Sequence, residues 1–206
     1  MKNKTPDFAY HMTKFFTEYL PIQRNLSPNS IATYRDTFRL LLLFYDTEKH
    51  IKPNLLTLDM LNVQQIEDFM LWLKKERNCG ASTCNQRLGA LKSFFRYLQF
   101  ALPDCALQCQ ENLAIRPMKQ PEPGLKYLTI DGIKLLLEQP DIKTKYGRRD
   151  LAILSLMYDT GARVQEIADI KIVHIRFSAP ATIRITGKGD KTRVVPLLSR
   201  TEDILK

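Results

Sequence analysis

Two short segments near the C-terminus carry residues that could handle a phosphodiester, and the first surrounds Arg163. A helix that stops at Gly161 and another that begins at Arg163 would place the arginine near a helix N-terminus, where unpaired N–H groups and the helix dipole favour an anion. Its planar guanidinium can bind two phosphate oxygens and bind them more tightly as charge develops. Glu166, one turn later, can hold the arginine rotamer. By spacing alone, an ordinary surface Arg–Glu ion pair is the favoured interpretation.

The second segment places Lys188 between Gly187 and Gly189. Glycines let the backbone turn tightly and let a lysine approach a groove without bulky neighbours. An ammonium group can attract a phosphate and also donate a proton to a departing oxygen, whereas a guanidinium is a poor acid. The alternative is an exposed turn whose charge is simply solvated.

The elements around these segments follow from local patterns. Residues 181–186 and 192–197 alternate with a β-branched bias, which predicts a β-hairpin with lysines at its tip. Before them, Thr129 can cap one helix, and a second helix is expected at about 148–158, with Gly161 at its left-handed end. The C-terminal part is therefore expected to combine helices with a small sheet.

The N-terminal half reads as a succession of helices. Ser27 and Pro28 open one with apolar residues at helical spacing, and another is expected at about 64–77. The helix that begins at Ser82 has an apolar stripe beside a polar one. The polar stripe consists of Asn85, Gly89, Lys92, Arg96 and Gln99. On this helix alone, a solvated basic face is the favoured interpretation of that stripe.

Proline, glycine and a lack of periodicity mark residues 114–126 as a semi-extended linker. The expected organisation is a helical domain at 1–113 and a second domain at 127–206. The expected fold class is mainly α with a small β-hairpin or sheet.

Composition restricts the partners. The chain has 31 Lys and Arg against 22 Asp and Glu, a net charge of +9 and a pI near 9.4, which favours a polyanion. No apolar run approaches the roughly 20 residues of a membrane span, and the N-terminus lacks the apolar core of a signal peptide. We therefore expect a cytoplasmic protein that binds nucleic acid, with no membrane partner.

Four cysteines, at positions 79, 84, 105 and 109, lack the tight Cys-x2-Cys spacing of zinc knuckles. We expect reduced thiols and no metal site.

Taken together, the segments T-G-A-R-V-Q-E at 160–166 and G-K-G-D-K-T-R-V-V-P-L at 187–197 closely resemble the paired motifs of the tyrosine recombinase (phage integrase) family. The combination, in this order and at this spacing, is far more specific than either part. The N-terminal half also resembles the family's helical core-binding domain, whose start is matched by residues 26–34. The resemblance covers nearly all of the chain.

The resemblance implies that Arg163 stabilises the scissile phosphate, that Lys188 protonates the 5′-hydroxyl leaving group and that Glu166 supports the arginine. It also implies a tyrosine nucleophile, a 3′-phosphotyrosyl link and no cofactor. Its partners would be double-stranded DNA with an inverted-repeat recombination site and other recombinase protomers. The side chains expected to bind DNA are Asn29, Tyr34, Arg35, Asn85, Arg87, Lys92, Arg96, Lys191 and Arg193.

The pattern departs from the family after the hairpin. No helical His-x-x-Arg follows it, and all eight tyrosines precede Arg163. The expected C-terminal domain is therefore an incomplete α+β catalytic domain, and this chain should not cut DNA by itself. Three hypotheses remain: the N-terminal part of an active recombinase, which we favour; a non-catalytic protein that occupies recombination sites or regulates an intact recombinase; and an unrelated basic helical regulator, which would leave the paired motifs unexplained.

Overall fold

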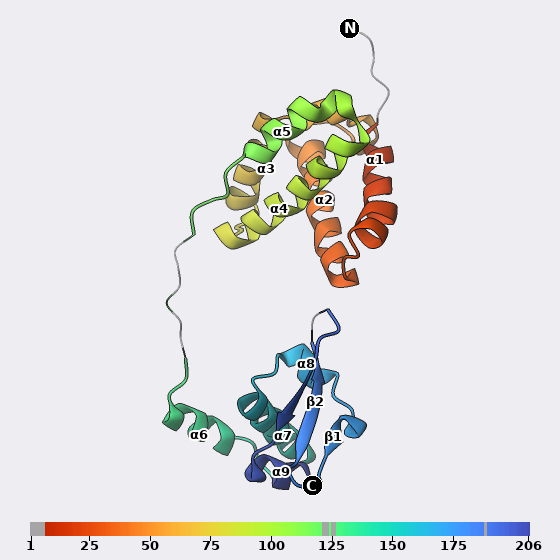
Figure 1. The fold of residues 1–206 in the computed structure, drawn as a ribbon. Coiled ribbons are helices and arrows are strands. Elements are labelled where there is room, and N and C mark those ends of the chain that lie inside the picture. The colour runs from red at the N-terminus through yellow and green to blue at the C-terminus, as the bar shows by residue number, and fades with distance from the viewer. Residues whose placement is uncertain (1–6, 121–123, 125–126, 188) are drawn as a thin grey trace. The chain divides into compact units, whose positions relative to one another are not determined.

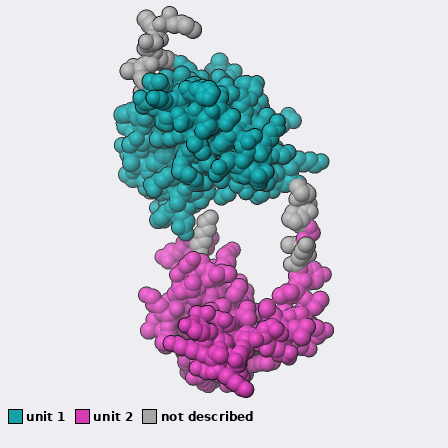
Figure 2. All heavy atoms as spheres, turned by 180° about the vertical axis from the view of Figure 1, so that it is seen from behind, with its two compact units in different colours: residues 1–123 teal, residues 124–206 magenta. Residues whose placement is uncertain are grey.

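The computed structural model describes residues 7–120, 124, 127–187 and 189–206. The chain divides into two compact units, Met1–Pro123 and Gly124–Lys206, which Figure 2 colours separately. Unit 1 is helical and unit 2 combines helices with a three-stranded antiparallel sheet (Figure 1). This agrees with the expected fold class.

The elements of unit 1 in chain order are α1 (Phe8–Lys14), the π-helix η1 (Phe15–Gln23), α2 (Pro28–Glu48), the 3-10 turns η2 (Pro53–Leu55) and η3 (Leu58–Met60), α3 (Val63–Lys75), α4 (Ala81–Ala101), η4 (Pro103–Cys105) and α5 (Ala106–Ala114). The helix starts follow the sequence closely. The Ser27 hydroxyl accepts the Ser30 N–H at 3.4 Å, and the Asn62 side chain accepts the Gln65 N–H at 3.1 Å. The expected helices at 28, 64 and 82 are confirmed, whereas α5 had no recognised signal.

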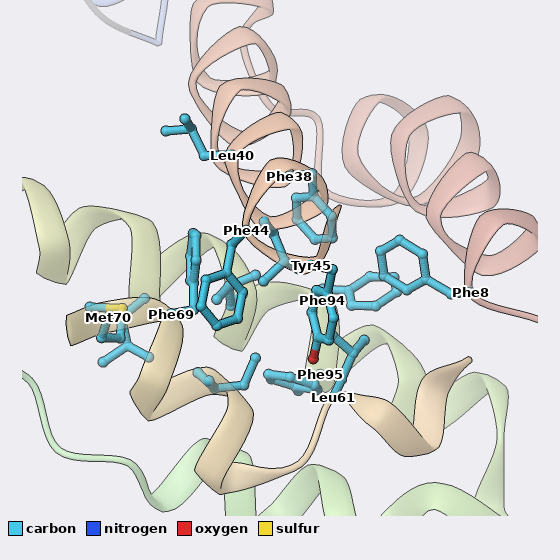
Figure 3. Packing of buried hydrophobic residues seen from close by; sticks show 14 of the residues in the cluster. Phe8, Phe38, Leu40, Phe44, Tyr45, Leu61, Phe69, Met70, Phe94 and Phe95 are labelled. Atoms are coloured by element: carbon cyan, nitrogen blue, oxygen red, sulfur yellow. The ribbon is translucent and has the colours of Figure 1, made fainter. Parts of the chain in front are cut away.

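An aromatic core holds unit 1 together. The Phe94 ring lies 5.1 Å from Phe15 and 5.2 Å from Phe38, centroid to centroid, in edge-on arrangements that suit aromatic pairs. Figure 3 shows the helices contributing rings to this core. Tyr45 is also buried, and its hydroxyl donates to the Met60 carbonyl at 2.7 Å. This rigid bundle fixes the faces that α2 and α4 present.

Residues 115–118, the docked segment, lie on unit 1 although the sequence assigns them to the linker. Ile115 is only 9% exposed and belongs to the core, and Met118 packs beside it. Part of the expected linker, at 121–123 and 125–126, lies outside the described residues. The described start of the linker is thus packed on the helical unit.

Unit 2 contains α6 (Ile130–Glu138), α7 (Lys145–Thr160), α8 (Val164–Ala168), the 3-10 turn η5 (Ile172–His174), β1 (Ile175–Arg176), β2 (Thr182–Thr186), β3 (Thr192–Pro196) and α9 (Ser199–Leu205). The strands pair antiparallel in the order β1-β2-β3. A small core of Leu156, Ala162, Ile167, Ile183 and Ile185 joins α7, α8 and β2. The capped helix after Thr129 and the hairpin are confirmed, and α7 begins earlier than expected because Thr144 caps it, accepting the Gly147 N–H at 2.9 Å.

Three further observations concern disulfides, metal-binding groups and membrane-spanning helices. The cysteines at 79, 84, 105 and 109 form no disulfide. Within the described parts of the chain, no group of three or more His, Cys, Asp or Glu side chains is placed to hold a metal ion. None of the helices in those same parts combines the length and apolar character that crossing a bilayer requires.

Candidate phosphate-binding site

The turn between α7 and α8 has every backbone donor from 161 to 163 engaged. Gly161, with φ of +59°, donates its N–H to the Met157 carbonyl at 3.0 Å. The Ala162 N–H donates to the Thr160 hydroxyl at 3.2 Å, and the Arg163 N–H donates to the Glu166 carboxylate at 3.1 Å. Because each of these N–H groups has a partner, the set holds the backbone of Arg163 in place. It confirms the helix stop at glycine and the helix start at arginine.

Glu166 connects three donors. Besides the backbone N–H, its Oε1 accepts Arg163 Nη1 at 3.0 Å and its Oε2 accepts Arg193 Nη2 at 2.8 Å. The side chain is only 5% exposed. Arg163, Glu166 and Arg193 form the carboxylate cluster, in which a buried acid on α8 joins a turn and a strand.

Hydrogen bonds hold the pKa of Glu166 at about 2, well below its ordinary value of 4.5. The hydrogen bond from Arg193 is the largest cause, and the backbone N–H of Arg163 follows. Burial acts in the opposite direction but is outweighed. The carboxylate therefore stays ionised at any physiological pH.

The guanidinium of Arg163 points largely into solvent, with 77% of its side chain exposed. One nitrogen contacts Glu166, and no other protein partner of its guanidinium is found among the described residues. Two guanidinium groups and one carboxylate leave a net charge of +1 in the carboxylate cluster, which suits an incoming phosphate.

The start of α8 offers an anion less than a long, unpaired helix N-terminus would. The backbone N–H of Arg163 is not available to an anion because Glu166 already accepts it. Moreover, α8 has only five residues, so its dipole adds little. An anion at this position would rely mainly on the guanidinium side chain.

The hairpin supplies the neighbouring residues. Lys188, the expected proton donor, lies outside the described residues. Gly189 has a φ of +76°, as the expected turn requires, and Lys191 is exposed. Gly187 has another role: a Cβ there would lie 2.5 Å from Oε1 of Glu166. The absent side chain at Gly187 makes room for the carboxylate.

Arg193 occupies a position that the strand pattern assigns to the core. Its Cα pairs with Ile185, which is fully buried, whereas its neighbour Val194 is 63% exposed. Sequence analysis missed a signal for this inward position. In the strand pattern, the arginine falls on the inward face and the neighbouring valine on the outward face. Arg193 was expected to bind DNA, but in this structure its Nη2 donates to Glu166. Its assignment to DNA stays a prediction.

The expected DNA-binding residues of α2 lie near its N-terminal end. Asn29 and Arg35 are exposed. Tyr34 is partly buried, with its ring stacked 6.4 Å from that of Phe15. Asn29 and Arg35 are thus available to a partner, while the ring of Tyr34 also supports the core.

The polar stripe of α4 is partly occupied by the protein itself. The side chain of Asn85 donates to the Met118 carbonyl at 2.8 Å and accepts the Met118 N–H at 2.7 Å. Lys92 donates to the Ile115 carbonyl at 2.6 Å. Both side chains therefore bind the docked segment, a use that sequence analysis did not anticipate. Their contact with DNA is untested.

The two remaining members of this set, Arg87 and Arg96, differ from each other. Arg87 contacts Asp36 of α2 at 3.4 Å and is largely buried, whereas Arg96 is exposed. A polar hollow between α2 and α4 is lined by Ala32, Thr33, Asp36, Thr37, Gln86 and Arg87. The structure thus brings the starts of α2 and α4 together on one unit.

Comparison with known proteins covers both units. Residues 14–100 match the family model described as "Phage integrase, N-terminal SAM-like domain", and residues 126–206 match "Phage integrase family". A protein of Sinorhizobium fredii named as an integrase/recombinase is 35% identical over 203 residues, covering 98% of this chain and 61% of that protein. Tyrosine recombinase XerD of Listeria innocua is 31% identical over 193 residues, covering 93% and 61%. The chain thus spans about three fifths of the length of these relatives.

Solved structures share the fold. The XerH site-specific recombinase bound to its difH substrate gives a TM-score of 0.62 at 23% identity, covering 88% of this chain and 52% of that one. The Tn1549 transposon integrase in complex with transposon right-end DNA gives 0.65 at 15% identity, covering 93% and 62%. The two family models, which together span most of both units, and the relatives that are 35% and 31% identical establish that the chain belongs to the phage integrase family of tyrosine recombinases.

Proposed function

We propose that this chain is the DNA-binding and phosphate-holding part of a site-specific tyrosine recombinase. The observation that carries the proposal is the exposed guanidinium of Arg163, which forms an ion pair with the buried carboxylate of Glu166. One structural neighbour is bound to its difH substrate, and another is in complex with transposon right-end DNA. On this proposal the partner is double-stranded DNA with an inverted-repeat site, occupied by paired recombinase protomers in the cytoplasm.

The chemistry would be a phosphoryl transfer without a cofactor. A tyrosine oxygen would attack the scissile phosphorus, the bond from phosphorus to the 5′-oxygen would break, and a 3′-phosphotyrosyl link would form. Arg163 would stabilise the added charge, and Lys188 would donate a proton to the departing 5′-oxygen. Every tyrosine among these 206 residues precedes Arg163, so we propose that the nucleophile comes from outside them.

The phosphate contact is tested by salt-titrated binding to duplex DNA. Affinity should fall steeply as salt rises, and Arg163→Ala should reduce the slope of log K against log salt by about 1 because one phosphate contact is lost. The matched control is Arg149→Ala, which removes another exposed arginine of unit 2. In this variant, the contribution of Arg163 to the slope should be unchanged. An unchanged slope in Arg163→Ala would exclude this phosphate contact.

Catalysis is tested separately with a nicked suicide substrate, which traps any covalent protein–DNA complex. We expect this chain to trap none and yet to protect paired half-sites from nuclease digestion. Trapping would show that a tyrosine of this chain is the nucleophile. The same pair of results would also fit a protein that occupies recombination sites without cutting them. The coding DNA beyond codon 206 distinguishes the two roles, because a recombinase fragment requires a downstream His-x-x-Arg followed by a tyrosine in one of the three frames and a non-catalytic occupant does not.

A further inference from the structure

The hairpin contributes more to the phosphate site than its lysines. Arg193 lies in β3 opposite the buried Ile185, and its Nη2 reaches Oε2 of Glu166, 27 residues away in the sequence. The side chain of Arg193 is 40% exposed, so more than half of it is shielded from solvent. An arginine on the core-facing side of a strand needs a buried anion, and Glu166 is that anion.

Glu166 in turn depends on this second arginine. Its two oxygens accept different donors. Oε1 accepts the Arg163 guanidinium, and Oε2 accepts both the Arg193 guanidinium and the Arg163 backbone N–H. With Arg163 alone, the carboxylate could rotate toward solvent together with the exposed guanidinium. Arg193 and the space left by the missing side chain of Gly187 hold the carboxylate in one orientation.

We propose that Arg193 is a positioning residue that acts through Glu166 to fix the guanidinium of Arg163 for phosphate, with Gly187 providing the space for the carboxylate. This inference rests on the proposed function, because it takes the ligand of Arg163 to be a DNA phosphate. It assigns Arg193 to the support of the site and not to a direct contact with DNA. It also gives the residue before Lys188 a steric purpose.

A double-mutant cycle separates positioning from direct contact. Binding of a fluorescein-labelled DNA duplex would be measured for Arg193→Gln in the presence of Arg163 and in the Arg163→Ala background. We expect Arg193→Gln to weaken binding by about 3- to 10-fold with Arg163 present and by less than about 2-fold without it. Glu166→Gln should behave in the same way, and Arg193→Lys should restore most of the loss.

The matched control is Arg184→Gln, which removes the same charge from the outward face of β2. Its effect should be equal in both backgrounds. If Arg193→Gln also weakens binding equally in both, Arg193 contacts DNA itself and the proposal is wrong. If it has no effect in either background, the proposal is wrong as well.

A second measurement on the free protein does not depend on DNA. Nuclear magnetic resonance would follow the titration of the Glu166 carboxyl and the order of the Arg163 Nε–H bond. Arg193→Gln and Gly187→Ala should raise the pKa of Glu166 and lower the order of Arg163. Gly189→Ala, which strains a positive-φ turn residue away from the carboxylate, should change neither.

The two measurements fail in different ways. If Arg163→Ala leaves DNA binding unchanged, the proposed function fails, and the free-protein titration still decides whether Arg193 positions Arg163. If that titration is unaffected by Arg193→Gln, the positioning role is overturned whatever DNA binding shows.

Discussion

Glu166 illustrates how one buried carboxylate can join a turn and a strand through three donors. Its carboxylate accepts a backbone N–H and two guanidinium groups, so the charge is fully satisfied although the side chain is buried. A buried carboxylate that lost one of these donors would be left partly unpaired, which is costly. Arg163 can therefore remain exposed and still have a defined position.

The lowered pKa of Glu166 predicts how acid affects unit 2. A carboxyl whose pKa falls from 4.5 to about 2 on folding contributes stability above pH 4.5 and loses that contribution as pH falls toward 2. Glu166→Gln should therefore unfold more easily than the wild type at neutral pH, and the difference should shrink between pH 4.5 and 2. Urea unfolding followed through the amide signals of β2 and β3 measures it.

Asp68→Asn provides the control for this acid effect. The hydrogen bond that Asp68 accepts from Lys49 lowers the pKa of Asp68, but Asp68 lies in unit 1. This substitution should leave the acid response of the strand amides unchanged. An identical acid response in Glu166→Gln and the wild type would contradict the role assigned to Glu166.

At the scale of elements, the two faces of α4 make different contacts. Its apolar side packs into the aromatic core, and its polar stripe holds the docked segment through Asn85 and Lys92. The amide of Asn85 acts as a strand partner would, donating to and accepting from the same residue, Met118. The polar stripe is therefore not simply solvated, as its pattern alone suggests.

Removal of the Asn85 side chain should release the docked segment. In Asn85→Ala we expect the Met118 amide to exchange with solvent much faster, since the lost pair of hydrogen bonds is worth roughly 1–3 kcal/mol. Hydrogen exchange at Met118 measures this, with the exposed neighbour Gln86→Ala as control. Asn85→Asp keeps the acceptor and loses the donor, so it should retain part of the protection. Unchanged protection in Asn85→Ala would refute the contact.

At the scale of the whole molecule, the two units have separate cores. Unit 1 holds a large aromatic cluster that ends at the docked segment, whereas the core cluster among the described residues of unit 2 is small and consists of Leu156, Ala162, Ile167, Ile183 and Ile185. The contacts of Ile115 place the end of the helical core beyond the last residue of α5. A boundary chosen from helix ends alone would remove part of that core.

This difference can be measured with two versions of unit 1. A chain of residues 1–120 should be more stable than one of residues 1–113 by about 1.5–3 kcal/mol, the value of burying an isoleucine side chain. The only tryptophan, Trp72, reports urea unfolding in both. Ile115→Ala in the longer chain should lose most of the gain. Equal midpoints for the two chains would show that the docked segment adds nothing.

Sequence alone determined the features that depend on neighbours a few residues apart. These features are the helix caps Ser27 and Thr129, the helix end at Gly161 and the hairpin, and all of them follow from hydrogen bonds or backbone conformations of residues close together in the sequence. The paired motifs around Arg163 and at the hairpin tip are also sufficient to indicate the family.

Tertiary structure alone decided which distant groups meet. Arg193 reaches Glu166 across 27 positions because the strand register turns it inward, and Asn85 reaches Met118 across 33 because the chain folds back on α4. Side-chain type shows that such groups need partners, but the choice of partner depends on packing between elements. Sequence therefore named Arg163 and Glu166, and only the fold showed that Arg193 of the hairpin donates to Glu166.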